Sequence, residues 1–388
     1  MTLALNRRDF LRSSCLTAGS LMIAGCESAP AAPTPSAPAP STPAPSTPPP
    51  VAASGFPLIA DTAARLDAAK ARALKAHGVK TIFRYYCHLP PSLPGKDLQP
   101  EEAKIILGEG LSLATVFQHY NNCFRTFENK WGREDAEQAL RMAQAAGQPS
   151  GSAIYFGVDA DWPYASLRDP IIAYFEDVKR AFEGSGIAVG VYSNGCICNT
   201  ILERGLADYF WLSGSTGHSG TQAFYNTGKW TIFQNALDVT PAQVGYAIDA
   251  DLANSATNGY FGQWNDKGAR TATHSPGETS ALFAARRFLN ANAEVMQDLN
   301  PGAASLASLR KDQNVRVLQA SGAFTRIVTQ EGGASRTAPA VQGYVPTSSL
   351  IPMNSFADKA GYGLCGAATV PNDTFKYQNC ERATSRLR

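Results

Sequence analysis

The stretch GSAIYFGVDAD, residues 151–161, is the part of the sequence that decides the fold. Its apolar run Ala153–Val158 has the length and composition of a buried strand. The run ends at two carboxylates, Asp159 and Asp161. Because residues i and i+2 of a strand point to the same side, both carboxylates can face one cleft if the extended geometry continues to Asp161.

The same pattern returns about ninety residues later, in YAIDADLAN at 246–254, where an apolar run ends at Asp249 and Asp251. A third carboxylate position, Asp61, closes the first apolar run of this region. Whether these side chains meet depends on how many strands lie between them and how the strands are connected.

Apolar runs alternate with amphipathic, helix-like segments from Leu58 to Trp264. The predicted strands are Leu58–Ala60, Thr81–Tyr86, Leu113–Gln118, Ala153–Val158, Ala188–Ser193, Tyr209–Ser213, Trp230–Gln234 and Gly245–Ile248. The clearest predicted helices are Ala64–His77, Glu101–Glu109, Glu134–Ala146 and Pro170–Glu183. Continuous apolar strands that alternate with helices indicate a parallel sheet covered on both faces.

Eight such strands predict an α/β fold, a closed (β/α)₈ barrel of the TIM type at residues 55–265. Residues 214–228 and 236–244 are short and poor in helical pattern, so the sixth and seventh helices are expected to be vestigial. An open, doubly wound sheet is the alternative, although no Gly-rich phosphate loop follows the first strand. In the barrel, Asp61, Asp159, Asp161 and Asp249 all lie at the C-terminal face, where barrel enzymes carry their chemistry.

Other strand ends are polar or aromatic as well. Tyr and Trp rings beside carboxylates suit sugar binding, and the alternative for each residue is a structural cap on a strand or a neighbouring helix. The predicted ligand-binding residues are Arg84, Tyr86, Gln118, Tyr192, Trp211, Gln234 and Asp251.

The N-terminus resembles an export signal. Asn6–Arg12 contains the arginine pair of the twin-arginine signal, and Ile23–Cys26 resembles a lipobox in which Cys26 is lipidated. The apolar stretch between them is shorter than the roughly 20 residues that span a bilayer, so residues 1–26 are excluded from the fold. Residues 27–54, rich in Pro, Ala, Ser and Thr, predict an extended tether.

Charge and cysteine content narrow the class of protein. The sequence has 34 Lys and Arg against 32 Asp and Glu, and loss of the signal, with three arginines and one aspartate, makes the two numbers equal. This balance argues against nucleic acid as a partner. Export permits disulfides; Cys365 and Cys380 flank a short tail loop and are the predicted pair, while Cys196 and Cys198 are expected to be small buried hydrophobes.

Several stretches together resemble a known family. The stretches are RALKAHGVKTIFRYY, GSAIYFGVDAD, VGVYSNG, FWLSGSTG, KWTIFQNA and YAIDADLAN. They resemble a glycoside-hydrolase-like domain family of unassigned activity (domain of unknown function 1906) that occurs in exported bacterial envelope proteins. That family is in turn similar to the family 25 lysozyme-like barrels.

The resemblance implies roles for the carboxylates. In the lysozyme-like enzymes the fourth strand ends in Asp-x-Glu, whose Glu is the general acid; Asp161 stands at that position and Asp159 at the preceding Asp. Asp61 and Asp249 match the Asp residues of the first and last strands. Aspartate in place of glutamate withdraws the acid by roughly 1.5 Å, and a misplacement of about 1 Å can cost a hundredfold in rate. Converging carboxylates could instead hold Mg²⁺ or Ca²⁺.

The region after the barrel predicts a second, smaller domain. Ser275–Glu278 reads as a capping box, followed by apolar residues at helical spacing, so a connecting helix is expected at 275–299. Alternating short strands and the ending GYVPTSSL resemble a bacterial SH3-like module at 308–352. Such modules often bind cell-wall peptide; a structural add-on is the alternative. Residues 353–388 form a tail.

Together these features predict a membrane-anchored lipoprotein of the cell envelope, exported by the twin-arginine pathway, with no cofactor. Its barrel is expected to hydrolyse or bind peptidoglycan or another envelope glycan, with Asp161 as acid and Asp159, Asp61 and Asp249 in support. The alternative is a catalytically inactive glycan-binding or scaffolding protein. The shortened acid favours the second reading, and the intact ring of other carboxylates favours the first.

Overall fold

The computed structural model describes residues 58–215, 218–239, 244–257, 259–269, 286–311, 313–329 and 341–352, together with Cys365 and Cys380. The predicted signal at 1–26, its Cys26 and the tether at 27–54 lie outside the described residues. Within the described ranges, no helix has the length and apolar content needed to cross a bilayer.

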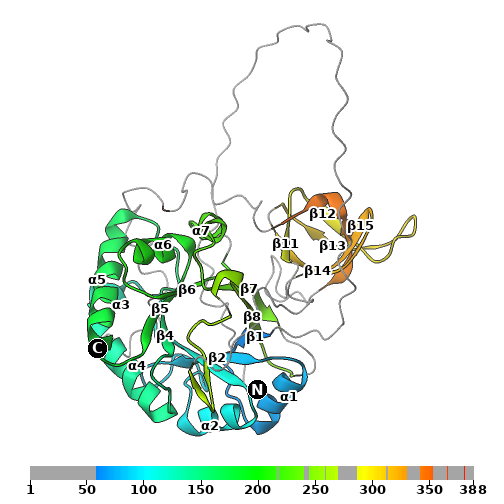
Figure 1. Cartoon of the computed structure of the whole chain (residues 1–388). Helices are drawn as coiled ribbons and strands as arrows, with labels where there is room; N and C mark the ends of the chain where they lie inside the picture. Colours follow the sequence, from blue (N-terminus) through cyan, green and yellow to red (C-terminus); the bar gives the residue numbers. More distant parts are fainter. Residues whose placement is uncertain are drawn as a thin grey trace, which may run out of the picture. The chain divides into compact units, whose positions relative to one another are not determined.

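Eight strands close into a barrel, which confirms the predicted fold class (Figure 1). They pair in sequence order, and β3 also pairs with β4 while β8 pairs with β1, so no edge remains open. The strands are β1 (Ile59–Asp61), β2 (Thr81–Tyr86), β3 (Ser112–Phe117), β4 (Ala153–Gly157), β5 (Ala188–Ser193), β6 (Tyr209–Leu212), β7 (Ile232–Val239) and β8 (Ile248–Ala253).

The eighth strand corrects the prediction of an all-parallel barrel. β8 runs antiparallel to both β7 and β1, whereas the other seven strands are parallel to one another. A parallel crossover needs a dozen or more residues, but an antiparallel return can be short, and only residues 240–247 separate β7 from β8. Asp249 and Asp251 therefore lie inside a strand near its start, not after the end of one.

Helices form the layer outside the strands (Figure 1). Asp67 caps the first helix by accepting from Lys70 N at 2.9 Å, and Gly147 ends the fourth with φ 72°, the left-handed value that glycine tolerates. The helices are α1 (Ala68–Ala76), α2 (Pro100–Gly108), α3 (Arg125–Glu128), α4 (Gly132–Ala146), α5 (Ala165–Phe182), α6 (Gly195–Glu203) and α7 (Thr221–Thr227). The short α7 agrees with the weak helical pattern expected at 214–228.

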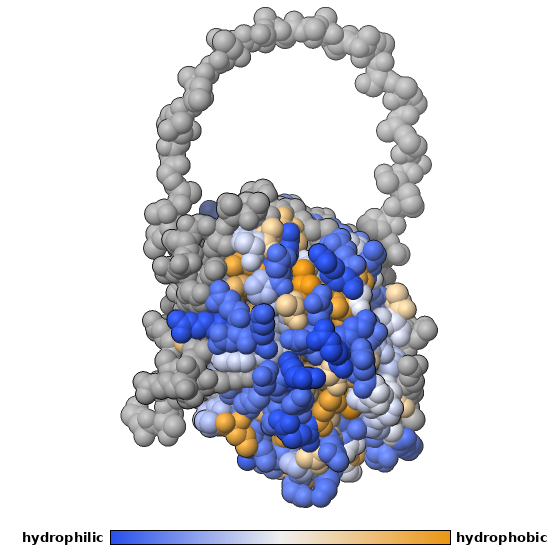
Figure 2. Space-filling view, turned by 90° about the vertical axis from the view of Figure 1, so that its left-hand side faces the viewer, coloured by the Kyte–Doolittle hydropathy of each residue, from blue (hydrophilic) through white to orange (hydrophobic). Residues whose placement is uncertain are grey.

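Figure 2 shows one face of the molecule, on which hydrophilic side chains surround scattered apolar ones. The apolar side chains of the helices instead pack against the sheet. Leu167, Ile171 and Val178 of α5, for example, are fully buried. This pattern is typical of amphipathic helices that cover a barrel.

Strict alternation along the strands separates the barrel interior from the helix layer. On β2, Phe83 and Tyr85 belong to the interior cluster, whereas Ile82 and Tyr86 belong to the outer one. The interior is filled with rings, and Gly190 makes room for one of them: a Cβ there would lie 2.5 Å from the Tyr155 ring. The same alternation decides which polar side chains can reach the mouth of the barrel.

The C-terminal region corrects the predicted helix at 275–299. Residues Arg286–Leu289 and Ala293–Met296 are strands β11 and β12, and residues 275–285 lie outside the described part. Phe288, Leu289 and Val295 are buried by a sheet, and their spacing only imitates a helical stripe because a turn at 290–292 separates them.

These two strands belong to the domain that was expected at 308–352. A seven-stranded antiparallel sheet spans Arg286–Pro352, so the domain begins earlier than predicted. Its other strands are β13 (Ser305–Leu309), β14 (Asn314–Ser321), β15 (Phe324–Thr329), β16 (Gln342–Pro346) and β17 (Leu350–Pro352).

Two disulfides correct the predicted cysteine pairing. Cys380 bonds to Cys123 in a loop before α3, and Cys365 bonds to Cys196 in the first turn of α6, so the two tail cysteines are not joined to each other. Cys198 is free and buried, as expected for a small hydrophobe, whereas Cys196 is buried but disulfide-bonded. Burial raises the pKa of the second free thiol, Cys87, to about 11, which leaves it unreactive at neutral pH.

Candidate functional site

Asp61 and Asp249 lie side by side at the C-terminal face of the barrel. They are direct partners in the β1–β8 register, and the amide of Gln234 from β7 joins them: its Nε2 donates to Asp61 Oδ2 and to Asp249 Oδ2, at 2.9 Å in each case. The two oxygens can therefore be no farther apart than twice that distance. All three side chains are buried, with Gln234 fully so.

Two tyrosines complete this cluster. Tyr85 donates its hydroxyl to Asp61 Oδ1 at 2.6 Å. Tyr192 donates to Gln234 Oε1 at 3.0 Å, and this bond turns the amide nitrogen of Gln234 toward the carboxylates. The sequence prediction included Tyr192 but missed Tyr85, although Tyr85 is two residues after the interior residue Phe83 on the same strand.

Asp159 is connected to a second group of polar side chains. Its Oδ2 accepts from Gln118 Nε2 at 2.6 Å, and Gln118 Oε1 accepts from Lys96 Nζ at 3.2 Å. Lys96 also lies over the ring of Tyr85, with Nζ 4.8 Å from the ring centre. Lys96 thus links the Asp159 group to the Asp61 cluster. Lys96 was not predicted, because it sits in a loop where neither strand nor helix periodicity points to it.

Exposure distinguishes Asp159 from the other carboxylates of this network. Asp159 is partly exposed, whereas Asp61 and Asp249 are buried. Among the residues that the structure describes, no donor reaches its other oxygen, Oδ1. Asp159 is therefore the carboxylate of the network that an incoming ligand can meet first.

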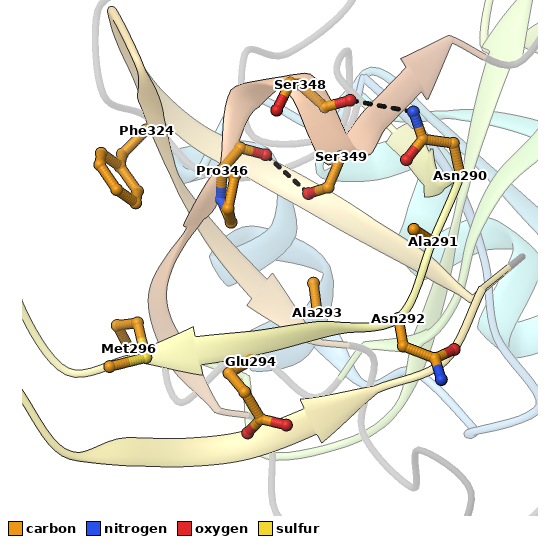
Figure 3. Close-up of a pocket in the computed structure, with 10 residues that line it drawn as sticks. All are labelled: Asn290, Ala291, Asn292, Ala293, Glu294, Met296, Phe324, Pro346, Ser348 and Ser349. Carbon is orange, nitrogen blue, oxygen red and sulfur yellow. Dashed lines mark hydrogen bonds between the residues drawn. The ribbon is translucent and has the colours of Figure 1, made fainter.

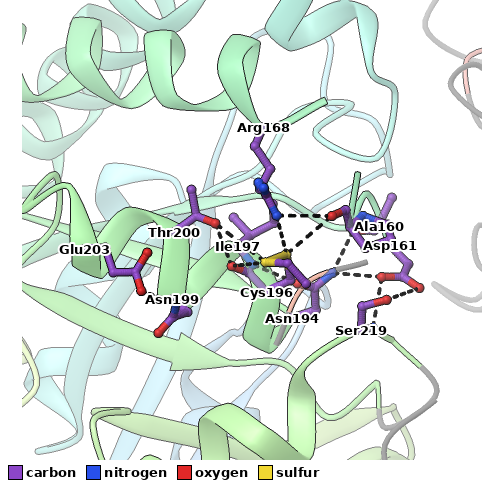
Figure 4. The surroundings of a disulfide bond; sticks show 12 residues. Ala160, Asp161, Arg168, Asn194, Cys196, Ile197, Asn199, Thr200, Glu203 and Ser219 are labelled. Atoms are coloured by element: carbon purple, nitrogen blue, oxygen red, sulfur yellow. Dashed lines mark hydrogen bonds between the residues drawn. A yellow bond between two sulfur atoms is a disulfide. The ribbon is translucent and has the colours of Figure 1, made fainter. Parts of the chain in front are cut away.

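Asp161 is held in a neighbouring but separate set of contacts (Figure 4). Its Oδ1 accepts from Ser219 N at 2.9 Å and from Asn194 Nδ2 at 3.3 Å, and its Oδ2 accepts from Ser219 Oγ at 3.2 Å. Asn194 is itself the N-cap of α6 and accepts from Ile197 N at 3.0 Å. These bonds join the loops that follow β4, β5 and β6.

Trp211 and Asp251 lie one layer below the mouth. Trp211 Nε1 donates to Asp251 Oδ1 at 2.8 Å, and Asp251 pairs with Ile59 in the register of β8 with β1. The indole packs against Phe83, with ring centres 4.3 Å apart, and is fully buried. These two residues form the floor of the site and present no exposed ring to a sugar.

The structure corrects the predicted roles of Arg84 and Tyr86. Both point away from the interior, because Phe83 and Tyr85 are the inward residues of β2. Arg84 forms a buried ion pair with Glu102 of α2 at 2.7 Å.

Tyr86 donates to Gln148 Oε1 at 3.0 Å, and burial raises the pKa of Tyr86 above its ordinary value, which keeps the hydroxyl a donor. The prediction that Arg84 and Tyr86 bind a ligand placed them on the wrong side of the sheet.

A hard cation was the alternative use of the carboxylates. Across the described ranges, no group of three or more His, Cys, Asp or Glu side chains is arranged to hold a metal ion. The Asp61, Asp249 and Asp159 carboxylates accept hydrogen bonds from amide and hydroxyl groups, an arrangement that orients carboxylates.

A separate pocket lies on the C-terminal sheet (Figure 3). Its volume is about 430 Å³. It is lined by Asn290, Ala291, Asn292, Ala293, Glu294, Met296, Phe324, Pro346, Ser348 and Ser349. Hydrogen bonds from Ser305 and Ser308 lower the pKa of Glu294, so the rim carries a negative charge.

Comparison with known proteins shows what the barrel is similar to. Residues 72–253 match the model of the Rv2525c-like, glycoside hydrolase-like domain. The chain is 30% identical to the uncharacterized protein FadG of Bacillus subtilis over 251 residues, which cover 62% of this chain and 42% of FadG. It thus spans less than half of that relative.

Two further comparisons concern Rv2525c of Mycobacterium tuberculosis, whose name gives it as a candidate peptidoglycan hydrolase. Identity is 24% over 196 residues, covering 49% of this chain and 78% of Rv2525c. The crystal structure of this Tat-secreted protein in complex with L-tartrate matches with a TM-score of 0.44 at 21% identity, over 54% of this chain and 98% of that one. Most of the barrel of this chain is therefore similar to the Rv2525c-like, glycoside hydrolase-like domain family.

Proposed function

We propose that the barrel hydrolyses a glycosidic bond in a glycan of the cell envelope, with peptidoglycan as the first candidate. The observation that carries the proposal is the pair of buried carboxylates, Asp61 and Asp249, held by one amide at the C-terminal face, with the partly exposed Asp159 in the same network. The match to the glycoside hydrolase-like domain model supports the reaction class, and the name of Rv2525c supports the choice of peptidoglycan.

The network suits the charges of glycoside hydrolysis. The transition state resembles an oxocarbenium ion, and hydrolases place two carboxyl groups about it, roughly 5–5.5 Å apart in retaining enzymes and 6.5–9.5 Å in inverting ones. Asp61 and Asp249, with their fixed hydrogen bonds, would stabilise the positive charge without reorganising. Asp159, with an oxygen that accepts no bond in the described part, would give the proton to the leaving oxygen.

This assignment moves the acid from Asp161 to Asp159. Both oxygens of Asp161 accept hydrogen bonds from Asn194 and Ser219. An acid must bring its proton to the leaving oxygen, so a carboxyl turned toward two fixed donors is less suited to the role. Asp161 would instead keep the loops around the mouth in place.

A glycan-binding barrel without turnover is the second candidate. It is favoured by the burial of Asp61 and Asp249, which are 1% and 5% exposed and leave little carboxylate surface for a substrate. In this case the network would be a structural floor beneath a binding surface.

The test compares two variants with the wild-type protein. Asp159→Asn is expected to lower turnover of peptidoglycan at least a hundredfold, because general acid catalysis contributes about 10²–10⁴ in rate. Asp161→Asn is expected to keep turnover within about tenfold and to lower the free energy of unfolding by about 1–3 kcal/mol, since it disturbs a satisfied set of donors. Soluble products are identified by mass spectrometry after incubation with purified peptidoglycan.

Each outcome assigns a role. The reverse order, with Asp161→Asn inactive and Asp159→Asn active, would return the acid to Asp161. Absence of products from wild-type protein that still sediments with peptidoglycan supports the binding role.

We also propose that the chain is exported and anchored through its N-terminus, and that the seven-stranded sheet is an SH3-like module. The support is the order of the sequence features: an arginine pair at Arg7 and Arg8, a lipobox ending at Cys26, and a Pro-rich tether. Secretion of Rv2525c by the twin-arginine pathway supports the same route. A tether would let the barrel work at a distance from the membrane.

Replacing Cys26 by Ala is expected to release the protein from the membrane fraction, because the cysteine thiol is the group that receives the lipid. The measurement is immunoblotting of membrane and soluble fractions. Replacing Arg7 and Arg8 by Lys is the companion variant, and it should block export altogether. Retention of Cys26→Ala in the membrane would contradict lipid anchoring.

A further inference from the structure

Lys96 is held at a defined place beside the mouth of the barrel. The loop that carries it is fixed on both sides: Arg84 Nη2 donates to Gly95 O at 2.9 Å, and Leu98 N donates to Tyr85 O at 2.8 Å. The side chain of Lys96 is only 6% exposed. A lysine in such a position keeps its ammonium group within a small region, since backbone and stem are both confined.

The contacts of Nζ determine the orientation of Gln118. Nζ lies 3.2 Å from Gln118 Oε1 and 3.4 Å from Ser92 Oγ. An ammonium group only donates hydrogen bonds, so the amide atom that faces it must be the oxygen. The amide nitrogen of Gln118 then faces Asp159, whose Oδ2 accepts at 2.6 Å.

Lys96 also touches the other half of the network. Its Nζ lies 4.8 Å from the ring centre of Tyr85, and the hydroxyl of that ring donates to Asp61. A cation over a ring is attracted to its face, so Lys96 favours the ring position from which Tyr85 reaches Asp61. One positive charge is thereby shared between the two groups of carboxylates.

We propose that Lys96 is a positioning residue for Asp159. Lys96 fixes the orientation of the Gln118 amide, whose nitrogen then donates to Oδ2 of Asp159. Oδ1 of Asp159 is left for the substrate. The importance of this for turnover rests on the proposed function, in which Asp159 is the proton donor. The orientation of Gln118 does not, and it can be measured without any substrate.

The first measurement is the NMR signal of the Gln118 side-chain amide in protein labelled with ¹⁵N at glutamine side chains. The signal is assigned by its loss in Gln118→Met. We expect Lys96→Met to shift it, because the amide loses the partner that fixes its sense, and Lys96→Arg to retain it, because a guanidinium also only donates. Lys70→Met is the control: Lys70 also lies over a tyrosine ring, that of Tyr246 at 5.5 Å, but belongs to α1. This control should leave the signal unchanged.

The second measurement is turnover or binding of peptidoglycan by the same variants. Lys96→Met is expected to lose about tenfold to a hundredfold, as small misplacements of a reacting group do, with rescue by Lys96→Arg. The double variant Lys96→Met with Gln118→Met should have the same turnover as Gln118→Met alone, because both changes remove the same Lys96–Gln118–Asp159 chain of hydrogen bonds. A full additional loss in the double variant, or an unmoved Gln118 signal in Lys96→Met, would overturn the proposal.

The two measurements separate this inference from the proposed function. If the Gln118 signal shifts in Lys96→Met but the wild-type protein releases no glycan products, the positioning role of Lys96 is supported and the hydrolase proposal is contradicted. Turnover that is normal in Lys96→Met removes the positioning role and leaves the hydrolase intact. If Lys96→Met does not fold, turnover is compared between Gln118→Met and Lys96→Arg. A loss in Gln118→Met with turnover retained in Lys96→Arg supports the proposal, and equal turnover in the two variants overturns it.

Discussion

Replacing Gln234 by glutamate is expected to lower the free energy of unfolding by about 4–7 kcal/mol at neutral pH. The new carboxylate would be buried with no exposed surface and would face Asp61 and Asp249, each 2.9 Å from the atom it replaces. Burial and like charges raise the pKa of such a group by up to 3–5 units, and each unit corresponds to about 1.36 kcal/mol. The side chain is nearly isosteric, so the loss would be electrostatic.

The loss should depend on pH in one direction. In the unfolded chain the introduced glutamate titrates with a pKa near 4.3, whereas its pKa in the folded state is raised. The folded state then binds more protons above about pH 4.3, so stability falls as pH rises through this region and recovers as pH falls below it. Denaturant titrations at several pH values measure the effect as the difference between variant and wild type.

Gln138→Glu is the matched control. Gln138 lies on the surface of α4 and accepts from Arg141 at 2.9 and 3.2 Å, so a carboxylate there gains a cationic neighbour and should change stability by less than about 0.5 kcal/mol. If Gln234→Glu were as stable as Gln138→Glu at neutral pH, Asp61 and Asp249 would not face one buried amide, and the candidate site would be wrong.

Replacing Arg84 by methionine is expected to cost about 3–5 kcal/mol. Arg84 is fully buried and donates to Glu102 at 2.7 Å and to Thr62 O at 2.6 Å. Methionine fills similar space but leaves Glu102, which is only 3% exposed, as a buried charge without its cation. Removal of one partner of a buried ion pair has a cost of this size because the remaining charge stays desolvated.

Arg65→Met provides the comparison on the surface. Arg65 is 52% exposed and pairs at 3.3 Å with Asp97, which is buried but also accepts from Gln99, so loss of this half-exposed pair is expected to cost only about 1 kcal/mol. Adding Glu102→Gln to Arg84→Met should recover part of the loss, since it removes the stranded charge while Leu66 N keeps its acceptor. Equal effects of Arg84→Met and Arg65→Met in chemical denaturation would show that the Arg84 pair is not buried.

Most of the architecture of the barrel can be predicted from local patterns in the sequence. Apolar runs and amphipathic segments are local patterns, and each element follows from about ten residues of chain, so strands such as Thr81–Tyr86 and the helix ended by Gly147 could be placed without tertiary information. It also predicted Asp61, Asp159 and Gln234 near one end of the barrel, because the ends of neighbouring parallel strands meet at one face.

The tertiary structure decided the rest, because these features depend on residues far apart in the sequence. The direction of β8 follows from pairing with both β1 and β7, and it brings Asp249 to the mouth from the start of a strand. The alternation of side chains along a strand requires that Arg84 and Tyr85 face opposite sides of the sheet. Only packing in the folded barrel decides which of the two sides faces the barrel interior.

The cysteine pairs join positions 257 and 169 residues apart, a choice that no local pattern contains. The place of Lys96 in the candidate site likewise depends on contacts between residues that are far apart in the sequence. A loop residue gains its role only from the side chains that the closed barrel brings within hydrogen-bond distance, here Gln118 from the neighbouring strand.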